Sequence, residues 1–163
     1  MRSRYAFLAV VLVLLAGPAA AWTIQGQVVA IVSGDTIKVR DAQHAQHTVR
    51  LAGLDAPEKF QNFGQRSEDS LRELVFQRHV VVESVRQGAA SRMGKVLFEG
   101  RDMNLEQLQR GFAWYAKSRA QDLSPEDQQA YAAAEADARV QRVGLWRDKN
   151  PIPPWEYRQG RRK

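Results

Sequence analysis

The architecture of this chain is set by two neighbouring stretches, SGDTIKV at residues 33–39 and RLAGLDAPE at residues 50–58. The first begins with Ser-Gly-Asp, which is a turn signal. Residues 36–40 and 47–51 alternate polar and apolar side chains, and this period of two predicts half-buried strands. Residues 24–32 are rich in β-branched side chains and predict another strand. Together the three segments predict an antiparallel meander.

Beyond this meander the chain turns from strands to helices. Further strands are expected at residues 80–85 and 96–98, with a helix at 67–78 before them. A second helix is expected from Asn104, which begins a capping-box-like pattern, and a third from Ser124, an N-cap followed by proline. Strands first and helices later predict an α+β domain. Five strands with a helix between the third and fourth have the order of an OB-fold β-barrel, here with three helices.

The first 21 residues predict a cleavable secretory signal peptide. A basic MRSR start precedes an unbroken apolar run over residues 5–16, and Gly-Pro and three alanines follow it. The apolar run is shorter than the roughly 20 residues that a membrane-spanning helix needs. We therefore expect cleavage after Ala21, a mature chain that starts at Trp22, and a secreted or periplasmic protein without a membrane anchor.

Length and composition describe one globular domain. The chain has 163 residues, which suits a single domain at residues 22–157 followed by a basic tail at 158–163. It contains no cysteine, which excludes disulfide scaffolds, zinc–cysteine sites, iron–sulfur clusters and thiol nucleophiles. The formal net charge of +6 falls to +4 once Arg2 and Arg4 leave with the signal peptide. This basic excess favours an anionic partner but does not choose among nucleic acid, lipid and polyphosphate.

Charged side chains gather at one corner of the predicted meander. Asp35 begins one strand and Asp55 follows the next, so an antiparallel hairpin brings their carboxylates together, where they attract a hard divalent cation. Arg50 alternates with core positions and points to the other face of its strand. The proline after Ala56 holds that residue extended, with its carbonyl aimed at the same place, and Glu58 follows within reach. Each of these residues alone is typical of a turn or of a solvated surface. Their spacing, which brings two carboxylates, an arginine and a glutamate together, favours a site for phosphodiester cleavage.

These motifs resemble those of the thermonuclease family, which has a staphylococcal nuclease-like domain. The resemblance extends over nearly all of the mature chain. Its first motif is Gly34-Asp35-Thr36 with Arg50 and Asp55-Ala56-Pro57-Glu58; similar later pieces are GRDMN at 100–104, GFAW at 111–114, GLW at 144–146 and NPIPPWE at 150–156. The resemblance implies an OB-fold endonuclease that uses one Ca²⁺ to hydrolyse DNA and RNA, leaving 3'-phosphate ends.

The family pattern also assigns roles to the candidate residues. It implies that Asp35 and Asp55 bind Ca²⁺ through their side chains and that Ala56 binds it through its backbone carbonyl. Arg50 would bind the scissile phosphate and stabilise the charge of the transition state. Glu58 would act as the general base for the attacking water, or position that base.

The chain departs from the family pattern at two places. Ser33 stands where the family usually has Asp, which predicts weaker calcium binding. The family's second motif ends in another phosphate-binding Arg, and this chain has ASRMGKVL at residues 90–97. A single deletion places Arg92 in that role, whereas the other register places Lys95 there, and we favour Arg92. Lysine is a poorer substitute because it lacks the planar two-pronged donor.

Two functions are consistent with these residues, and a third, binding of a membrane surface or a polyanion by the basic tail, rests on charge alone. The first is a secreted or periplasmic Ca²⁺-dependent nuclease with DNA and RNA as substrates, expected as a monomer. The second is a nucleic-acid-binding OB-fold module with weak or lost catalysis, which applies if neither Arg92 nor Lys95 reaches the phosphate. His44 and His47 are expected to be solvated rather than to bind a transition metal. Lys117 and Arg119 fit two places, the lining of the substrate cleft and a solvated basic face, and the basic face is the simpler account.

Overall fold

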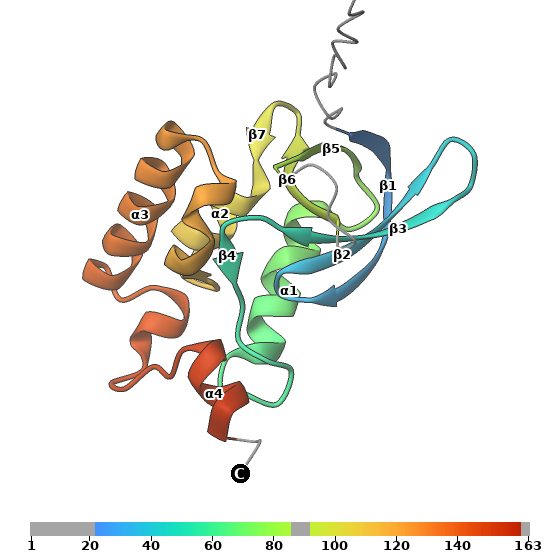
Figure 1. Cartoon of the computed structure of the whole chain (residues 1–163). Coiled ribbons are helices and arrows are strands. Elements are labelled where there is room, and N and C mark those ends of the chain that lie inside the picture. Colours follow the sequence, from blue (N-terminus) through green and yellow to red (C-terminus); the bar gives the residue numbers. More distant parts are fainter. Residues whose placement is uncertain (1–21, 86–91, 161–163) are drawn as a thin grey trace, which may run out of the picture.

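The computed structural model describes residues 22–85 and 92–160, and it contains a closed β-barrel with helices packed on one side (Figure 1). The barrel strands are β1 (Thr23–Ser33), β2 (Thr36–Asp41), β3 (Gln46–Leu51), β5 (His79–Ser84) and β6 (Arg92–Phe98). They run in the order β3-β2-β1-β5-β6 with antiparallel neighbours, and β3 pairs with β6 in parallel to close the barrel. The α+β class, the meander and the five-stranded OB-fold barrel are confirmed. The predicted signal peptide at 1–21 and the end of the predicted tail lie outside the described residues.

Short elements and helices complete the fold. The helices are α1 (Gly64–Val75), α2 (Met103–Gln109), α3 (Pro125–Val140) and α4 (Pro154–Gly160), with 3₁₀ turns η1 (Lys117–Asp122) and η2 (Gly144–Arg147). Three two-residue strands are β4 (Leu54–Asp55), β7 (Arg101–Asp102) and β8 (Trp114–Tyr115); β4 pairs with β8. In Figure 1, α2 and α3 lie beside the barrel, and α4 lies near the loop that follows β4. In the described part of the chain, no helix is long and apolar enough to cross a bilayer.

The helices differ from the prediction in number and in position. The sequence predicts three helices, and α4 is an additional one. It has seven residues and follows a proline-rich stretch, so it is too short to produce a recognisable 3.6-residue period. Its span also places residues 158–160, expected in a basic tail, within a helix. Helix α1 lies nearer the N-terminus than the predicted 67–78, between Phe63 and Gln77, which both have positive φ.

The core follows from the alternation of the strands. Ile37 and Val39 on β2, and Val49 and Leu51 on β3, are fully buried, as the period of two predicts. They join one large cluster that α1 and α3 close, with Tyr131 of α3 buried in it. A second, smaller cluster holds the C-terminal part of the chain and consists of Trp114, Ala138, Leu145 and Trp146.

Helix α2 begins at a different residue from the one predicted. The N-cap is Asp102, whose carboxylate accepts hydrogen bonds from the backbone N–H groups of Asn104 and Leu105 at 2.9 and 3.1 Å. The predicted capping box at Asn104 is therefore wrong. Asn104 is instead fully buried, and its side chain accepts a hydrogen bond from the Val96 N–H. It also donates to the carbonyls of Ala52 and Gly94 at 3.0 and 3.1 Å, which links the end of β3 to β6.

Replacing this amide tests its contribution to barrel closure. Asn104→Ala leaves three buried backbone groups without that partner, so we expect the free energy of unfolding to fall by about 2–4 kcal/mol. Urea unfolding followed by far-UV circular dichroism measures this loss. Gln65→Ala is the control, because Gln65 is exposed and bonds only along its own helix to Asp69; its effect should stay within about 0.5 kcal/mol. Equal effects of the two substitutions would contradict the role of Asn104.

Candidate active site

Asp35 lies in the turn between β1 and β2 and is 6% exposed. The hydroxyls of Ser33 and Thr36 donate to its Oδ1 at 2.8 and 2.9 Å. Arg50 donates to its Oδ2 from Nε at 3.0 Å. Ser33, at the position that departs from the family pattern, therefore orients the carboxylate of Asp35.

The turn that carries Asp35 is fixed against α1 by close packing. A Cβ on Gly34 would lie 1.8 Å from the Ser67 hydroxyl and 2.9 Å from the Ala56 side chain. The Gly34 carbonyl accepts a hydrogen bond from the buried side chain of Gln107 at 3.0 Å. Only glycine fits here, so the position of Asp35 depends on contacts with α1 and α2.

Asp55 reaches the same place from β4 and is 4% exposed. Its strand is held by pairing with Trp114 of β8. Arg50 lies opposite Thr36 in the β2–β3 ladder. Its Nη2 donates to Asp55 Oδ1 at 2.9 Å and lies 2.8 Å from Asp35 Oδ2. One guanidinium thus joins both carboxylates. The structure brings together the three residues that the hairpin argument placed at this corner.

Two further arginines reach Asp55. Arg119 of η1 lies 3.9 Å from Asp55 Oδ2 and donates to the Leu54 carbonyl at 3.1 Å. Arg158 of α4 donates from Nη2 to Asp55 Oδ2 at 2.8 Å and from Nη1 to Asp55 Oδ1 at 3.2 Å. Burial, with the charge of nearby Arg50, lowers the pKa of Arg119. Hydrogen bonds to Asp55 raise the pKa of Arg158, which therefore stays charged.

The sequence alone predicts neither of these contacts with Asp55. It predicts Arg158 in the basic tail, and Arg119 on a solvated basic face or in the lining of the substrate cleft. Arg158 is 103 positions from Asp55, and no periodicity links two residues so far apart. The available signal was the proline–tryptophan stretch before Arg158, which indicated that the C-terminal segment packs against the domain.

Glu58 and Ala56 complete the corner. Glu58 accepts a hydrogen bond from Arg158 Nη1 at 2.7 Å, and its side chain is 38% exposed, so solvent reaches it. Ala56 is buried, and its backbone N–H lies 3.5 Å from Asp35 Oδ2. The carboxylates of Asp35, Asp55 and Glu58 are thus joined through the side chains of Arg50 and Arg158, and Ala56 borders the same group.

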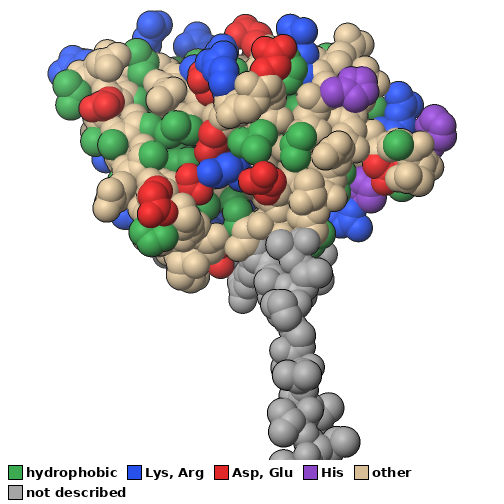
Figure 2. Space-filling model, turned by 90° about the horizontal axis from the view of Figure 1, so that it is seen from above, with side chains coloured by type: hydrophobic (Ala, Val, Ile, Leu, Met, Phe, Trp, Pro, Cys, Tyr) green, Lys and Arg blue, Asp and Glu red, His purple; other side chains and the backbone are tan. Residues whose placement is uncertain are grey.

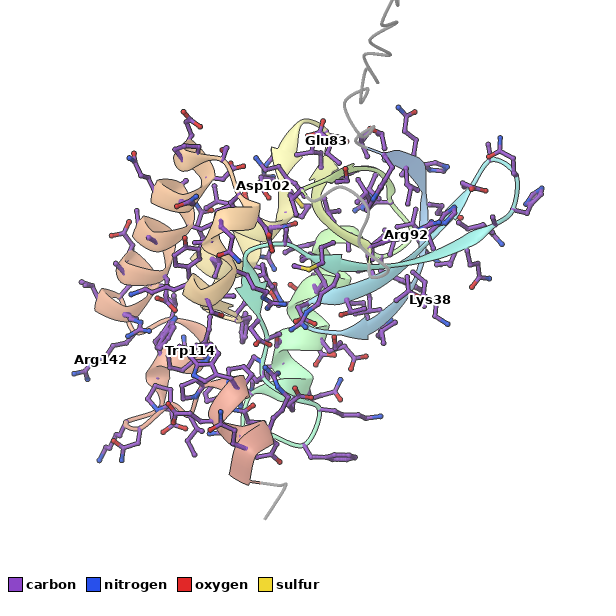
Figure 3. All side chains as sticks on the ribbon, viewed as in Figure 1. Lys38, Glu83, Arg92, Asp102, Trp114 and Arg142 are labelled. Atoms are coloured by element: carbon purple, nitrogen blue, oxygen red, sulfur yellow. The ribbon has the colours of Figure 1, made fainter. Side chains whose placement is uncertain are left out.

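The structure does not bring Arg92 or Lys95 to this group. Arg92 lies next to Val49 in the β3–β6 ladder, but its exposed side chain contacts the ring of His47. Figure 3 shows Arg92 across the molecule from Trp114, the partner of Asp55 in the β4–β8 pair. Lys95 pairs with Asp127 at 2.6 Å and lies 3.7 Å from Asp102. The placement of Arg92 follows from the register of β6, and residues 90 and 91 lie outside the described residues.

Of the two histidines expected to be solvated, His44 is exposed, but the expectation is wrong for His47, whose side chain is only 15% exposed because it packs beside Asp41. His47 Nε2 lies 2.6 Å from an Asp41 carboxylate oxygen, an interaction that lowers the pKa of Asp41. Across residues 22–85 and 92–160, no cluster of three or more His, Cys, Asp or Glu side chains could hold a metal ion. A cation at the site would therefore combine the two carboxylates of Asp35 and Asp55 with backbone oxygen and water.

Acidic and basic groups are equal in number at the site, and they are also intermixed on the surface of the molecule. Three carboxylates, those of Asp35, Asp55 and Glu58, face the guanidinium groups of Arg50, Arg119 and Arg158. Figure 2 shows acidic and basic side chains intermixed over one face of the molecule, without a broad patch of one sign. The binding of an anionic ligand at the site therefore depends on the local arrangement of charged groups and not on the net charge of the chain.

Known proteins resemble this chain over most of its length. A family model described as "Staphylococcal nuclease homologue" matches residues 48–148. "Protein ParB" of Escherichia coli is 35% identical over 175 residues, covering 97% of this chain and 94% of that protein. An "Uncharacterized endonuclease" of Escherichia coli O157:H7 is 34% identical, with 93% and 96% covered. "Micrococcal nuclease" of Shigella flexneri is 35% identical, with 85% and 83% covered.

The close approach at Gly34 is open to a direct test. Gly34→Ala forces a methyl group into Ser67 and displaces the turn that holds Asp35, so we expect the melting temperature to fall by about 5–10 °C. Differential scanning calorimetry in chelator measures the shift without any contribution from metal binding. Gly160→Ala is the matched control because nothing lies within 4 Å of the added carbon. A melting temperature of Gly34→Ala equal to that of the control would show that the turn tolerates the methyl group.

Proposed function

The chain belongs to the family of staphylococcal nuclease homologues, and on this basis we propose that it is a Ca²⁺-dependent nuclease that hydrolyses phosphodiester bonds of DNA and RNA. The family, and relatives whose names include nuclease or endonuclease, support nuclease activity. The observation that carries the proposal is the Arg50 side chain, which joins Asp35 and Asp55 at a partly exposed corner of the barrel.

The donors at this corner suit Ca²⁺. Asp35 and Asp55 offer carboxylate oxygens that both lie within hydrogen-bond distance of one Arg50 nitrogen, so a single cation can reach both. Oxygen ligands of this kind, completed by a backbone carbonyl and water, are those that Ca²⁺ takes. In the proposal Ala56 supplies the carbonyl. A bound Ca²⁺ would supply positive charge beside the phosphate.

The remaining residues have complementary roles in the proposed reaction. Arg50 offers a guanidinium that can bind phosphate oxygens and stabilise the charge that builds up as the bond breaks. Glu58 is reached by solvent and can accept a proton from a water molecule. The water oxygen then bonds to phosphorus and the bond to the 5'-oxygen breaks. The 5'-oxygen leaves with a proton from solvent, and the phosphate stays on the 3'-oxygen.

A second candidate function has one observation in its favour. Neither Arg92 nor Lys95 contacts the acidic residues of the site, so the phosphate contact expected from the sequence is missing there. A barrel that binds nucleic acid and cleaves it slowly is consistent with that loss. Turnover measured at known enzyme concentration separates this candidate from a fast nuclease.

Cleavage by the mature chain tests the main proposal. The protein spanning residues 22–163 should degrade plasmid and single-stranded DNA and RNA in Ca²⁺, and lose this activity in chelator. Glu58→Gln removes the proton acceptor while keeping the size of the side chain, so we expect the rate to fall by about 10²–10⁴-fold. Gel electrophoresis gives the rates, and end-labelling gives the chemistry of the new ends.

The matched control for this experiment is Glu126→Gln, which changes an exposed glutamate in the first turn of α3. Its rate should equal that of the wild-type protein. Binding without cleavage by the wild-type protein would support the second candidate, and cleavage that persists in chelator would remove Ca²⁺ from the proposal.

We also propose that the protein is exported and cut after Ala21, as its N-terminal sequence pattern indicates. Expression of the full chain in a Gram-negative host should yield a periplasmic product whose N-terminus, read by mass spectrometry, is Trp22. A chain lacking residues 2–21 is the control and should stay in the cytoplasm. Recovery of an uncut chain from the membrane fraction would contradict the export proposal.

A further inference from the structure

We propose that Arg158 of α4 is a second phosphate-binding guanidinium of the site. This inference rests on the proposed nuclease function. It assigns a substrate contact to a residue near the C-terminus, more than a hundred positions from Asp55.

The Arg158 guanidinium lies between the two carboxylates that define the reaction. Nη1 donates to Glu58 Oε1 at 2.7 Å, and Nη2 donates to Asp55 Oδ2 at 2.8 Å. In the proposed reaction the phosphate is attacked by a water molecule next to Glu58, and its charge would be neutralised by a cation that Asp55 helps to hold, so the phosphate lies between these side chains. It therefore lies next to Arg158.

Helix α4 is anchored so that Arg158 is already in place. The ring of Trp155 packs edge-on against Trp114, with centroids 5.7 Å apart, and Trp114 pairs with Asp55. The Tyr157 hydroxyl donates to the Phe60 carbonyl at 3.1 Å, in the loop that carries Glu58. The helix is thus attached to both elements that supply the acidic residues. Holding a guanidinium in position beforehand reduces the entropy lost when it binds a ligand.

A second anchor lies just before the helix. The side-chain amide of Gln61 donates to the Ile152 carbonyl at 2.6 Å, and Asn62 donates to the Asp148 carboxylate at 2.7 Å. These bonds join the segment that leads into α4 to the loop after β4. The placement of Arg158 therefore does not depend on its own ion pairs alone.

The other two arginines are less suited to a second contact. Arg50 is already bonded to both Asp35 and Asp55. Arg119 donates to the Leu54 carbonyl, and its side chain is less exposed than that of Arg158, at 25% against 37%. Arg158 donates to side chains that can exchange partners when an anion arrives. Its planar fork can bind two oxygens of one phosphate, which a lysine ammonium cannot do in the same geometry.

The test compares Arg158→Gln and Arg158→Lys with Arg142→Gln in the mature chain. Arg142 is exposed, follows the C-terminal end of α3, and loses the same single charge when replaced. Cleavage of a single-stranded oligonucleotide in Ca²⁺ gives kcat/KM. We expect Arg158→Gln to lose about a hundredfold or more, Arg158→Lys to recover only part of that loss, and Arg142→Gln to stay within about twofold of the wild-type protein.

Binding is measured separately so that the result does not depend on turnover. Fluorescence anisotropy of a labelled oligonucleotide in chelator reports only the contacts made by the protein. We expect the Kd to rise about tenfold for Arg158→Gln and to change little for Arg142→Gln. Circular dichroism and melting temperature establish that each variant is folded, and Arg158→Lys keeps the charge if the glutamine variant is unstable.

Several outcomes would overturn the inference. If Arg158→Gln cleaves and binds as the Arg142→Gln control does, Arg158 is not a phosphate contact, while the proposed nuclease function stands. If Arg158→Gln cleaves faster or needs less Ca²⁺ than the wild-type protein, the arginine is an inhibitory contact that competes for Asp55. If the wild-type protein does not cleave, the proposed function fails, and the binding measurement in chelator still decides the role of Arg158.

Discussion

Two carboxylates buried side by side at the corner of a small barrel need positive charge next to them, and Arg50 supplies it. Desolvated carboxylates are costly unless they are paired and hydrogen-bonded. Asp35 and Asp55 are both nearly inaccessible, and the Arg50 guanidinium bonds to each. The β2–β3 ladder places Arg50 opposite Thr36, so formation of this ladder brings Arg50 next to the turn that carries Asp35. The same concentration of charge can bind a cation and a phosphate.

The balance of charge also involves the helical half of the molecule. Arg119 comes from the segment after β8, and Arg158 comes from α4, so the site collects side chains from four separate parts of the chain. In the second, smaller core cluster, Trp114 of β8 packs edge-on against Trp146 of η2 in the C-terminal half of the chain. Trp155 extends the cluster toward α4. Aromatic packing outside the site therefore helps to position the Arg158 guanidinium at the acidic residues.

Local patterns in the sequence were sufficient for the barrel and for the centre of the site. Alternation of polar and apolar residues identified the meander, and the buried residues of β2 and β3 are those that it predicts. The spacing of Asp35, Arg50 and Asp55 predicted their meeting, because a hairpin has a fixed register once its faces are known. The predicted start of α2 is wrong because Asp102 and Asn104 are both good capping residues. Hydrogen bonds to the end of β3 and to β6 hold the Asn104 side chain in the core, so it does not cap the helix.

The sequence by itself determined the three-stranded meander, the α+β class and the acidic corner, since these follow from periods of two and from turn residues within short stretches. Only the tertiary structure decided which arginines reach that corner. Arg92 was the sequence-based choice, and the register of β6 turns it toward His47 instead. Arg158 reaches Asp55 because α4 packs against the loop after β4 and against Trp114. Contacts between distant segments depend on how whole elements pack, and no local pattern of residues encodes that.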